Sequence, residues 1–250
     1  PLRYGAAVGQ LSFFSADVAA PTLADLGGLL AAHGQVSIGE DGSRLSIVVP
    51  DQWRATALAD EFNRRELECT VGVAAEQQVA EQRVAVPAVA AEPARPAVPV
   101  EPAEPAQPGQ AAPSSAARPP GRPMRGYLVR SARTHQLDPL AAAWTRGSVK
   151  TVPPFPVPTG GFLRCWALAA GRAEESGYLL GIDEHASQMY PRLAAGLAAV
   201  GLTGAVIGSR GGGPGIRVVG RRRLGRLVEL LGDPPAGAPA DCFPSDSADG

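Results

Sequence analysis

Residues Leu26–Gly34 read LGGLLAAHG and form the second half of a predicted helix. Thr22 is a favourable N-cap, and Asp25 stands three residues later in the reciprocal capping position. Gly34 follows the last helical residue, where glycine commonly ends a helix. The chain is therefore expected to enter a short helix rich in glycine, alanine and leucine.

Two short alternating stretches follow this helix and predict an antiparallel hairpin. They cover Gln35–Ile38 and Arg44–Val49, and the Asp41-Gly42 pair between them is a strong turn signal. Alternation divides the side chains between two faces. The apolar face is expected to hold Val36, Ile38, Leu45, Ile47 and Val49, and the other face Gln35, Ser37, Arg44 and Ser46.

The same order of elements occurs twice along the chain. In the first block, a helix beginning at Asp51 is followed by strands at Glu68–Val73 and Gly126–Arg130 and by a helix from Asp138 that ends at Gly147. The second block has a helix FLRCWALAA that ends at Gly171, a short segment RAEES that leads through Gly177 into a strand YLLGID, a helix QMYPRLAAGLAAV, strands at Thr203–Gly208 and Ile216–Gly220, and a final helix RRLGRLVELL. Periodicity thus predicts two blocks of the form αββαββα.

A segment rich in proline and alanine interrupts the first block. Eleven of the 25 prolines lie between Pro87 and Pro123, with almost no large apolar residues between them. Such a segment cannot bury enough surface to offset the entropy cost of ordering, and we expect disorder. The predicted organisation is a first repeat at 1–84, a linker or insertion at 85–125, the end of the first repeat at 126–158, a second repeat at 159–232 and a disordered tail at 233–250. Arg83–Val86 (RVAV) is an alternative fourth strand, which would place the linker after it.

Leu26–Gly34 resembles the nine-residue LAGLIDADG motif of homing endonucleases. Its identities are Leu26, Gly28, Leu29, Ala32 and Gly34, and the counterpart Leu163–Gly171 keeps Leu163, Ala169 and Gly171. The resemblance implies an α+β fold with two pseudo-symmetric αββαββα LAGLIDADG-like repeats and antiparallel sheets. It also implies that the two motif helices pack side by side, where small residues permit a close approach.

In active members of this family, the last acidic residue of each motif holds a divalent cation. Here those positions are His33 and Ala170. Alanine cannot bind a metal, and one imidazole is a poor ligand for Mg²⁺. The resemblance therefore implies a nuclease-dead member with no metal and no other cofactor. In lacking these acidic residues, the chain is similar to the N-terminal domain of the WhiA-type sporulation regulators of actinomycetes. The strong preference for arginine and alanine is typical of a GC-rich genome.

The formal net charge of -1 conceals an uneven distribution. Residues 1–79 hold 5 arginines and 10 acidic residues, whereas residues 125–232 hold 13 arginines, Lys150 and 6 acidic residues. The basic second repeat predicts contacts with double-stranded DNA, whose phosphates and guanines arginine binds. The candidate DNA-binding residues are Arg44, Arg130, Arg210, Arg217, Arg221, Arg222 and Arg223.

Other features limit the location and leave alternatives open. Three scattered cysteines cannot form a disulfide framework, and no stretch reaches about 18 consecutive apolar residues. The sequence PLRYGAAVGQ lacks a signal-peptide pattern. We therefore expect a cytoplasmic protein without a membrane partner. The leading hypothesis is a non-catalytic DNA-binding module, with a regulatory role. The alternatives are a scaffold that binds a protein partner and not nucleic acid, and a residual metal-dependent endonuclease that uses His33.

Overall fold

The computed structural model describes residues 15–17, 19–74, 126–147, 149–154, 158–208, 213–239 and 242–244. Its first half runs to residue 154 and its second half starts at residue 158. The elements of the first half are η1 (Leu23–Leu26), α1 (Gly27–Ala31), β1 (Gln35–Gly39), β2 (Gly42–Val49), α2 (Gln52–Asn63), β3 (Cys69–Val73), β4 (Tyr127–Ser131), η2 (His135–Leu137), α4 (Asp138–Trp144), β5 (Thr145–Arg146) and β6 (Val149–Lys150).

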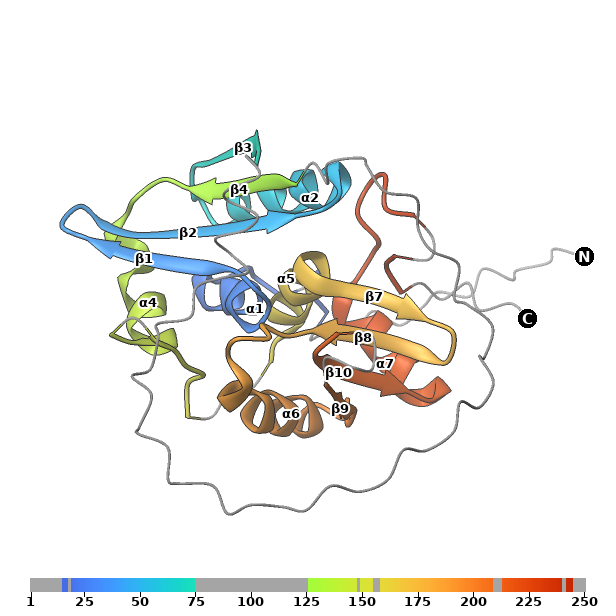
Figure 1. Ribbon diagram of the computed structural model, residues 1–250. Coiled ribbons are helices and arrows are strands. Elements are labelled where there is room, and N and C mark those ends of the chain that lie inside the picture. Colours follow the sequence, from blue (N-terminus) through green and yellow to red (C-terminus); the bar gives the residue numbers. More distant parts are fainter. Residues whose placement is uncertain are drawn as a thin grey trace, which may run out of the picture.

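The second half repeats the order helix, two strands, helix, two strands, helix, without a described counterpart of β5 and β6. Its elements are α5 (Gly160–Ala170), β7 (Gly171–Glu174), β8 (Gly177–Gly181), η3 (Ser187–Met189), α6 (Tyr190–Ala199), β9 (Ala205–Ile207), β10 (Gly215–Val219) and α7 (Arg221–Leu231). Each half contains one four-stranded antiparallel sheet, with strand orders β1-β2-β4-β3 and β7-β8-β10-β9. The identical topologies confirm the predicted pair of αββαββα repeats. Figure 1 shows the two sheets on either side of the central helices α1 and α5.

The first sheet joins segments that lie far apart in the sequence. β4 pairs with β2 along one edge and with β3 along the other. The fourth strand of the first repeat therefore follows the proline- and alanine-rich segment. The alternative strand at 83–86 and the predicted disorder at 85–125 both lie outside the described residues.

Three local expectations differ from the structure. Thr145 and Arg146, expected to end a helix, form β5 and pair with β6. Ile38 lies on the predicted apolar face but is 62% exposed, because it is close to the hairpin tip. The tail expected to be disordered from residue 233 is partly packed: Phe243 is only 1% exposed, and the Cys242 carbonyl accepts a hydrogen bond from the Tyr178 hydroxyl.

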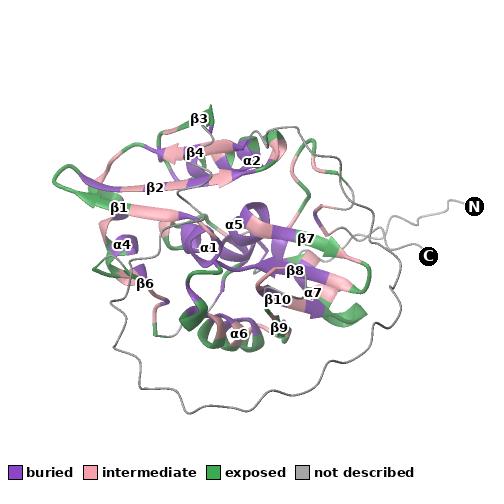
Figure 2. Ribbon diagram, viewed as in Figure 1, coloured by how far each residue is buried: buried purple, intermediate pink, exposed green. Residues whose placement is uncertain are grey.

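Helices α1 and α5 contact each other so closely that a side chain on Gly28 has no space. A Cβ atom there would clash with the Phe162 carbonyl oxygen and lie 2.7 Å from the Trp166 amide nitrogen. On the other side of α1, a Cβ at Gly27 would lie 2.8 Å from the Trp144 ring. Figure 2 shows that this central helix pair is buried, whereas the strands alternate between buried and more exposed residues.

A buried ionic network joins the halves near the N-terminal ends of α1 and α5. The Glu61 carboxylate accepts hydrogen bonds from Arg65 (2.7 Å) and from Arg164 of α5 (2.9 Å). Arg65 also donates to Asp25 (3.0 Å), which accepts a bond from the hydroxyl of Thr159, the N-cap of α5. Because every charge in this network has a partner, burial carries no unpaired-charge penalty.

The Gly28→Ala variant should be less stable than the wild type by at least about 2 kcal/mol, because the added methyl group would push two backbones apart. Urea unfolding followed by circular dichroism measures this difference. Gly225→Ala is the matched control, since a Cβ at Gly225 of α7 meets nothing within 4 Å. That control should be neutral or more stable by up to about 1 kcal/mol. Equal stability of Gly28→Ala and wild type would contradict the packing described.

Candidate nucleic-acid interface

The first sheet presents a polar face on the side opposite its core. The strand register aligns Gln35, Ser46, Arg130 and Thr70 in one row across all four strands. Arg44 lies two residues before Ser46 and therefore on the same face. The other face is apolar and buried, with Leu45, Ile47, Val49 and Val129 packed into the core. We call the polar side the outer face of the sheet.

Arg44 and Arg130 form no ion pair with any described residue. Both are half-buried, and the Arg44 Nε atom is buried without a hydrogen-bond partner in the described part of the chain. A buried N–H without a partner is uncommon, so the Arg44 side chain has unused hydrogen-bonding capacity. Neither guanidinium group is therefore neutralised by a carboxylate of the described residues.

The second sheet carries two more arginines on its corresponding outer face. Its register aligns Arg172, Leu179, Arg217 and Ala205 across the four strands. Both arginines contact Glu174: Arg217 donates a short hydrogen bond to it, and the Arg172 Nη2 atom lies 3.6 Å from its carboxylate. Arg217 is thus already paired, which weakens its predicted role as a phosphate contact.

The candidate arginines do not all meet on one surface. Arg221, Arg222 and Arg223 are exposed in the first turn of α7, next to the end of β10, and Arg223 also donates to the Val219 carbonyl (3.1 Å). Arg210 lies outside the described residues. The structure therefore brings Arg44 and Arg130 together on one face and places the α7 arginines at the far end of the other sheet.

The topology also changes the meaning of the charge distribution. Arg130, Arg133, Arg146 and Lys150 belong to the first half, although they follow residue 125 in the sequence. The first half is therefore less acidic, and the second less basic, than a division by residue number indicates. Across the described strands of both sheets, the charged outer-face residues are four arginines and a single acid, Glu174. The acidic tip of the β1–β2 hairpin, Glu40 and Asp41, lies beyond the strands.

His33 and Ala170 lie where each central helix turns into its first strand. The His33 Nε2 atom donates to the Val48 carbonyl oxygen at 2.8 Å. Nε2 therefore carries a proton, since a carbonyl oxygen can only accept a hydrogen bond. Burial lowers the pKa of His33, and the Val48 bond opposes that shift.

A cationic side chain lies at the end of each central helix. Arg54 of α2 donates to the carbonyls of Ala167 (3.0 Å), Leu168 (2.9 Å) and Gly171 (2.6 Å) at the C-terminus of α5. Lys150 donates to the Ala32 carbonyl at the end of α1 (3.1 Å) and to the Asp183 carboxylate (2.7 Å).

The two charges of the Lys150–Asp183 pair perturb each other. Burial lowers the pKa of Lys150, and the Asp183 charge opposes this. Burial acts to raise the pKa of Asp183, but the Lys150 ammonium group and the hydrogen bond from the His185 amide together hold that pKa below its usual range.

Sequence reasoning missed Arg54, Arg172, Lys150 and Asp183. Lys150 is the single lysine of the chain, and this rarity is the sequence signal that could have drawn attention to it. Asp51 and Asp183 also share a position, each two residues after the second strand of its repeat. Neither signal identifies the partner, because the contacts depend on how the two halves pack.

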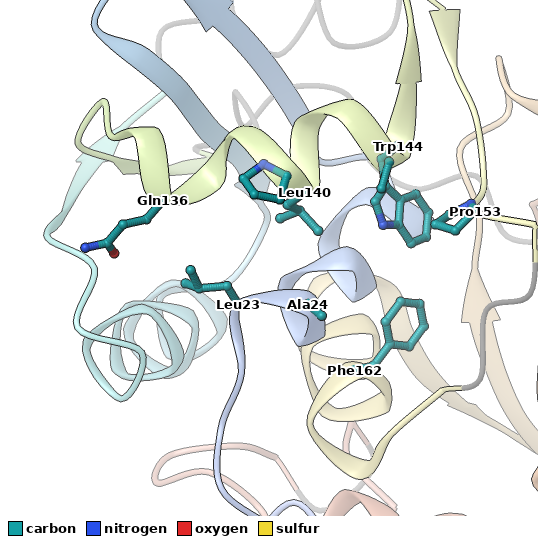
Figure 3. A pocket seen from close by; sticks show the side chains of 9 residues that line it. Leu23, Ala24, Gln136, Leu140, Trp144, Pro153 and Phe162 are labelled. Atoms are coloured by element: carbon teal, nitrogen blue, oxygen red, sulfur yellow. The ribbon is translucent and has the colours of Figure 1, made fainter.

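An apolar pocket of about 370 Å³ lies apart from these surfaces. Figure 3 shows Trp144 and Phe162 at one end and Gln136 at the other. The two rings are stacked with centroids 6.0 Å apart. The lining contains no ionisable residue and none of the predicted site residues, so it offers no group for acid–base chemistry. Its lining residues are Leu23, Ala24, Gln136, Pro139, Leu140, Ala143, Trp144, Pro153 and Phe162.

Among solved structures, the chain resembles "The homing endonuclease I-WcaI bound to its DNA recognition sequence". The TM-score is 0.52 with 10% sequence identity, and the match covers 92% of this chain and 90% of that chain. The chain has a LAGLIDADG-like fold. No protein-family model and no curated protein matches the sequence.

The LAGLIDADG-like fold implies a divalent cation at the ends of the central helices, but the residues present do not fit one. Ala170 offers only a methyl group, and with Nε2 protonated His33 could offer only Nδ1, a nitrogen ligand that Mg²⁺ disfavours. Lys150 and Arg54 take backbone carbonyls nearby. In the described part of the chain, no three His, Cys, Asp or Glu residues are grouped so that they could hold a metal ion. No described helix is long and apolar enough to cross a membrane.

Stability should fall more steeply for the wild type than for His33→Gln between pH 7.5 and 5.5. In the unfolded chain the pKa of His33 is about 6.5, whereas burial lowers its pKa in the folded protein. The stability that depends on neutral His33 is fully present above pH 6.5 and is lost as the pH falls toward the folded pKa. Its pH dependence cannot exceed about 1.4 kcal/mol per pH unit.

Glutamine is the appropriate replacement, since its amide can still donate to the Val48 carbonyl but does not titrate. Urea unfolding at each pH gives the free energy of unfolding for both proteins. Parallel pH profiles would show that His33 titrates alike in the folded and unfolded states.

Proposed function

We propose that the protein binds double-stranded DNA across the outer faces of its two sheets and does not cleave it. The observation that carries this proposal is the charge of those faces: in the described strands, Arg44, Arg130, Arg172 and Arg217 stand against Glu174 alone. Arginine side chains on strands can contact phosphates and also form paired hydrogen bonds with guanine. Uncharged Gln35, Ser46 and Thr70 beside them add donors and acceptors suited to base edges.

The similar fold of a protein solved with its DNA recognition sequence supports this proposal. We also propose a regulatory role, by analogy with the WhiA-type regulators. Arg221, Arg222 and Arg223 are proposed as peripheral phosphate contacts, because they are exposed at the end of β10. Arg217 is proposed as a weaker contact, since binding must compete with Glu174.

The double variant Arg44→Ala/Arg130→Ala should bind duplex DNA at least about tenfold more weakly at low salt. Each lost phosphate contact reduces the salt slope by about 0.9, so the slope of log K against log salt should become shallower by about 2. Fluorescence anisotropy with labelled duplexes at several salt concentrations measures both quantities.

Arg226→Ala is the control, because it removes an arginine of α7 that lies on neither outer face and pairs with Glu229 (3.0 Å). Its affinity should remain within about twofold of the wild type. Absence of wild-type binding at low salt would contradict the proposal. A protein partner retained after nuclease treatment would then favour the scaffold alternative.

The wild type should not nick supercoiled plasmid in the presence of Mg²⁺ or Mn²⁺ under conditions where it binds the plasmid. The reason is chemical: Ala170 and the protonated Nε2 of His33 provide no oxygen ligand for a hard cation. Agarose electrophoresis of plasmid topoisomers detects nicking. Metal-dependent nicking that is lost in His33→Ala would instead establish a residual endonuclease.

A further inference from the structure

The two cations at the ends of α1 and α5 have a common arrangement. Each is paired with an aspartate that stands two residues after the second strand of a repeat: Arg54 with Asp51 (3.1 Å) and Lys150 with Asp183 (2.7 Å). In both cases the carboxylate comes from one half and the capped helix from the other half. Arg54 and Asp51 belong to the first half and cap α5; Asp183 belongs to the second half, and its lysine caps α1.

This arrangement concentrates negative charge at the junction between the halves. The last carbonyls of a helix have no partner within the helix, and they carry partial negative charge. A carboxylate beside them adds a full charge. Lys150 and Asp183 have only 13% and 9% of their side chains exposed, so water does little to stabilise this charge. The position therefore requires a cation.

We propose that Lys150 and Arg54 are built-in replacements for a divalent cation at this junction. The Asp183 carboxylate and the Ala32 carbonyl form a cation-binding site that the Lys150 ammonium group fills from within the chain. Arg54 fills the corresponding position at α5, where it takes three carbonyls. The two halves are consequently held together without metal, and the relative orientation of their sheets does not depend on divalent ions.

The proposal makes a prediction about the wild type that requires no substitution. Its melting temperature should change by less than about 1 °C between EDTA and millimolar Mg²⁺ or Mn²⁺ at constant ionic strength. A rise of several degrees with either ion would overturn the proposal, because it would mean that the cation position is not filled by the chain.

Lys150→Ala supplies the decisive test. Removing the ammonium group leaves Asp183 buried without its partner, and the melting temperature should fall by about 5–15 °C. Millimolar Mn²⁺ or Ca²⁺ should then restore several degrees by binding to the emptied position. Sodium chloride of equal ionic strength should not restore them. Failure of divalent ions to stabilise this variant would overturn the proposal.

Two further variants separate cation replacement from loss of packing. Lys150→Met keeps the length of the side chain and fills the position with an apolar group, so divalent ions should not stabilise it. Lys150→Ala/Asp183→Asn lacks the carboxylate, and its rescue should also be lost. If Lys150→Ala does not fold in EDTA, the fraction of protein that refolds is measured in place of the melting temperature. Circular dichroism gives this fraction after refolding with Mn²⁺ or with NaCl. Equal recovery in both would contradict the proposal.

Discussion

The close contact between α1 and α5 is the constraint on which the rest of the structure depends. At Gly28 the two backbones lie so close together that no side chain fits between them. The sheets extend from the ends of these helices, because β1 and β7 begin within a few residues of them. Gly171 has no space for a side chain either, since a Cβ atom there would lie 2.6 Å from the Ala167 carbonyl oxygen. The helix pair thereby fixes where each sheet starts, and with it the distance between the two outer faces.

Polar contacts at both ends of the helix pair convert this apolar contact into a defined orientation. Near the N-terminal ends, Glu61 joins Arg65 to Arg164 across the halves. At the C-terminal ends, Arg54 and Lys150 bond the helix carbonyls. Packing alone allows one helix to slide or rotate on the other, whereas buried charges tolerate few geometries because an unpaired charge is costly. Next to these contacts, the His33 Nε2 atom donates to the Val48 carbonyl oxygen, and Ala170 carries only a methyl group.

The fold was accessible from the sequence because its signals are local. The cap at Thr22, the periodicity of the helices and the alternation of Arg44–Val49 each depend on neighbouring residues, and the repeated order of elements predicted both sheets. The site was less accessible because its contacts join distant segments. Glu174 neutralises Arg217 only because β7, β8 and β10 are adjacent, and Arg130 belongs to the first sheet only because β4 inserts between β2 and β3. The burial of Phe243 could not be predicted either, because this residue belongs to no segment with a helical or strand periodicity.

Strand insertion also explains why the net charge of a block is a poor guide to its binding surface. The acidic residues of the first half lie mainly on helices, turns and the hairpin tip, while its strands carry arginine and uncharged polar residues. In the second half, one glutamate is placed between two arginines on the sheet itself. A half with more acidic residues can therefore present the more available guanidinium groups. Among the described residues, no carboxylate pairs with Arg44 or Arg130, whereas an anion at Arg217 must compete with Glu174.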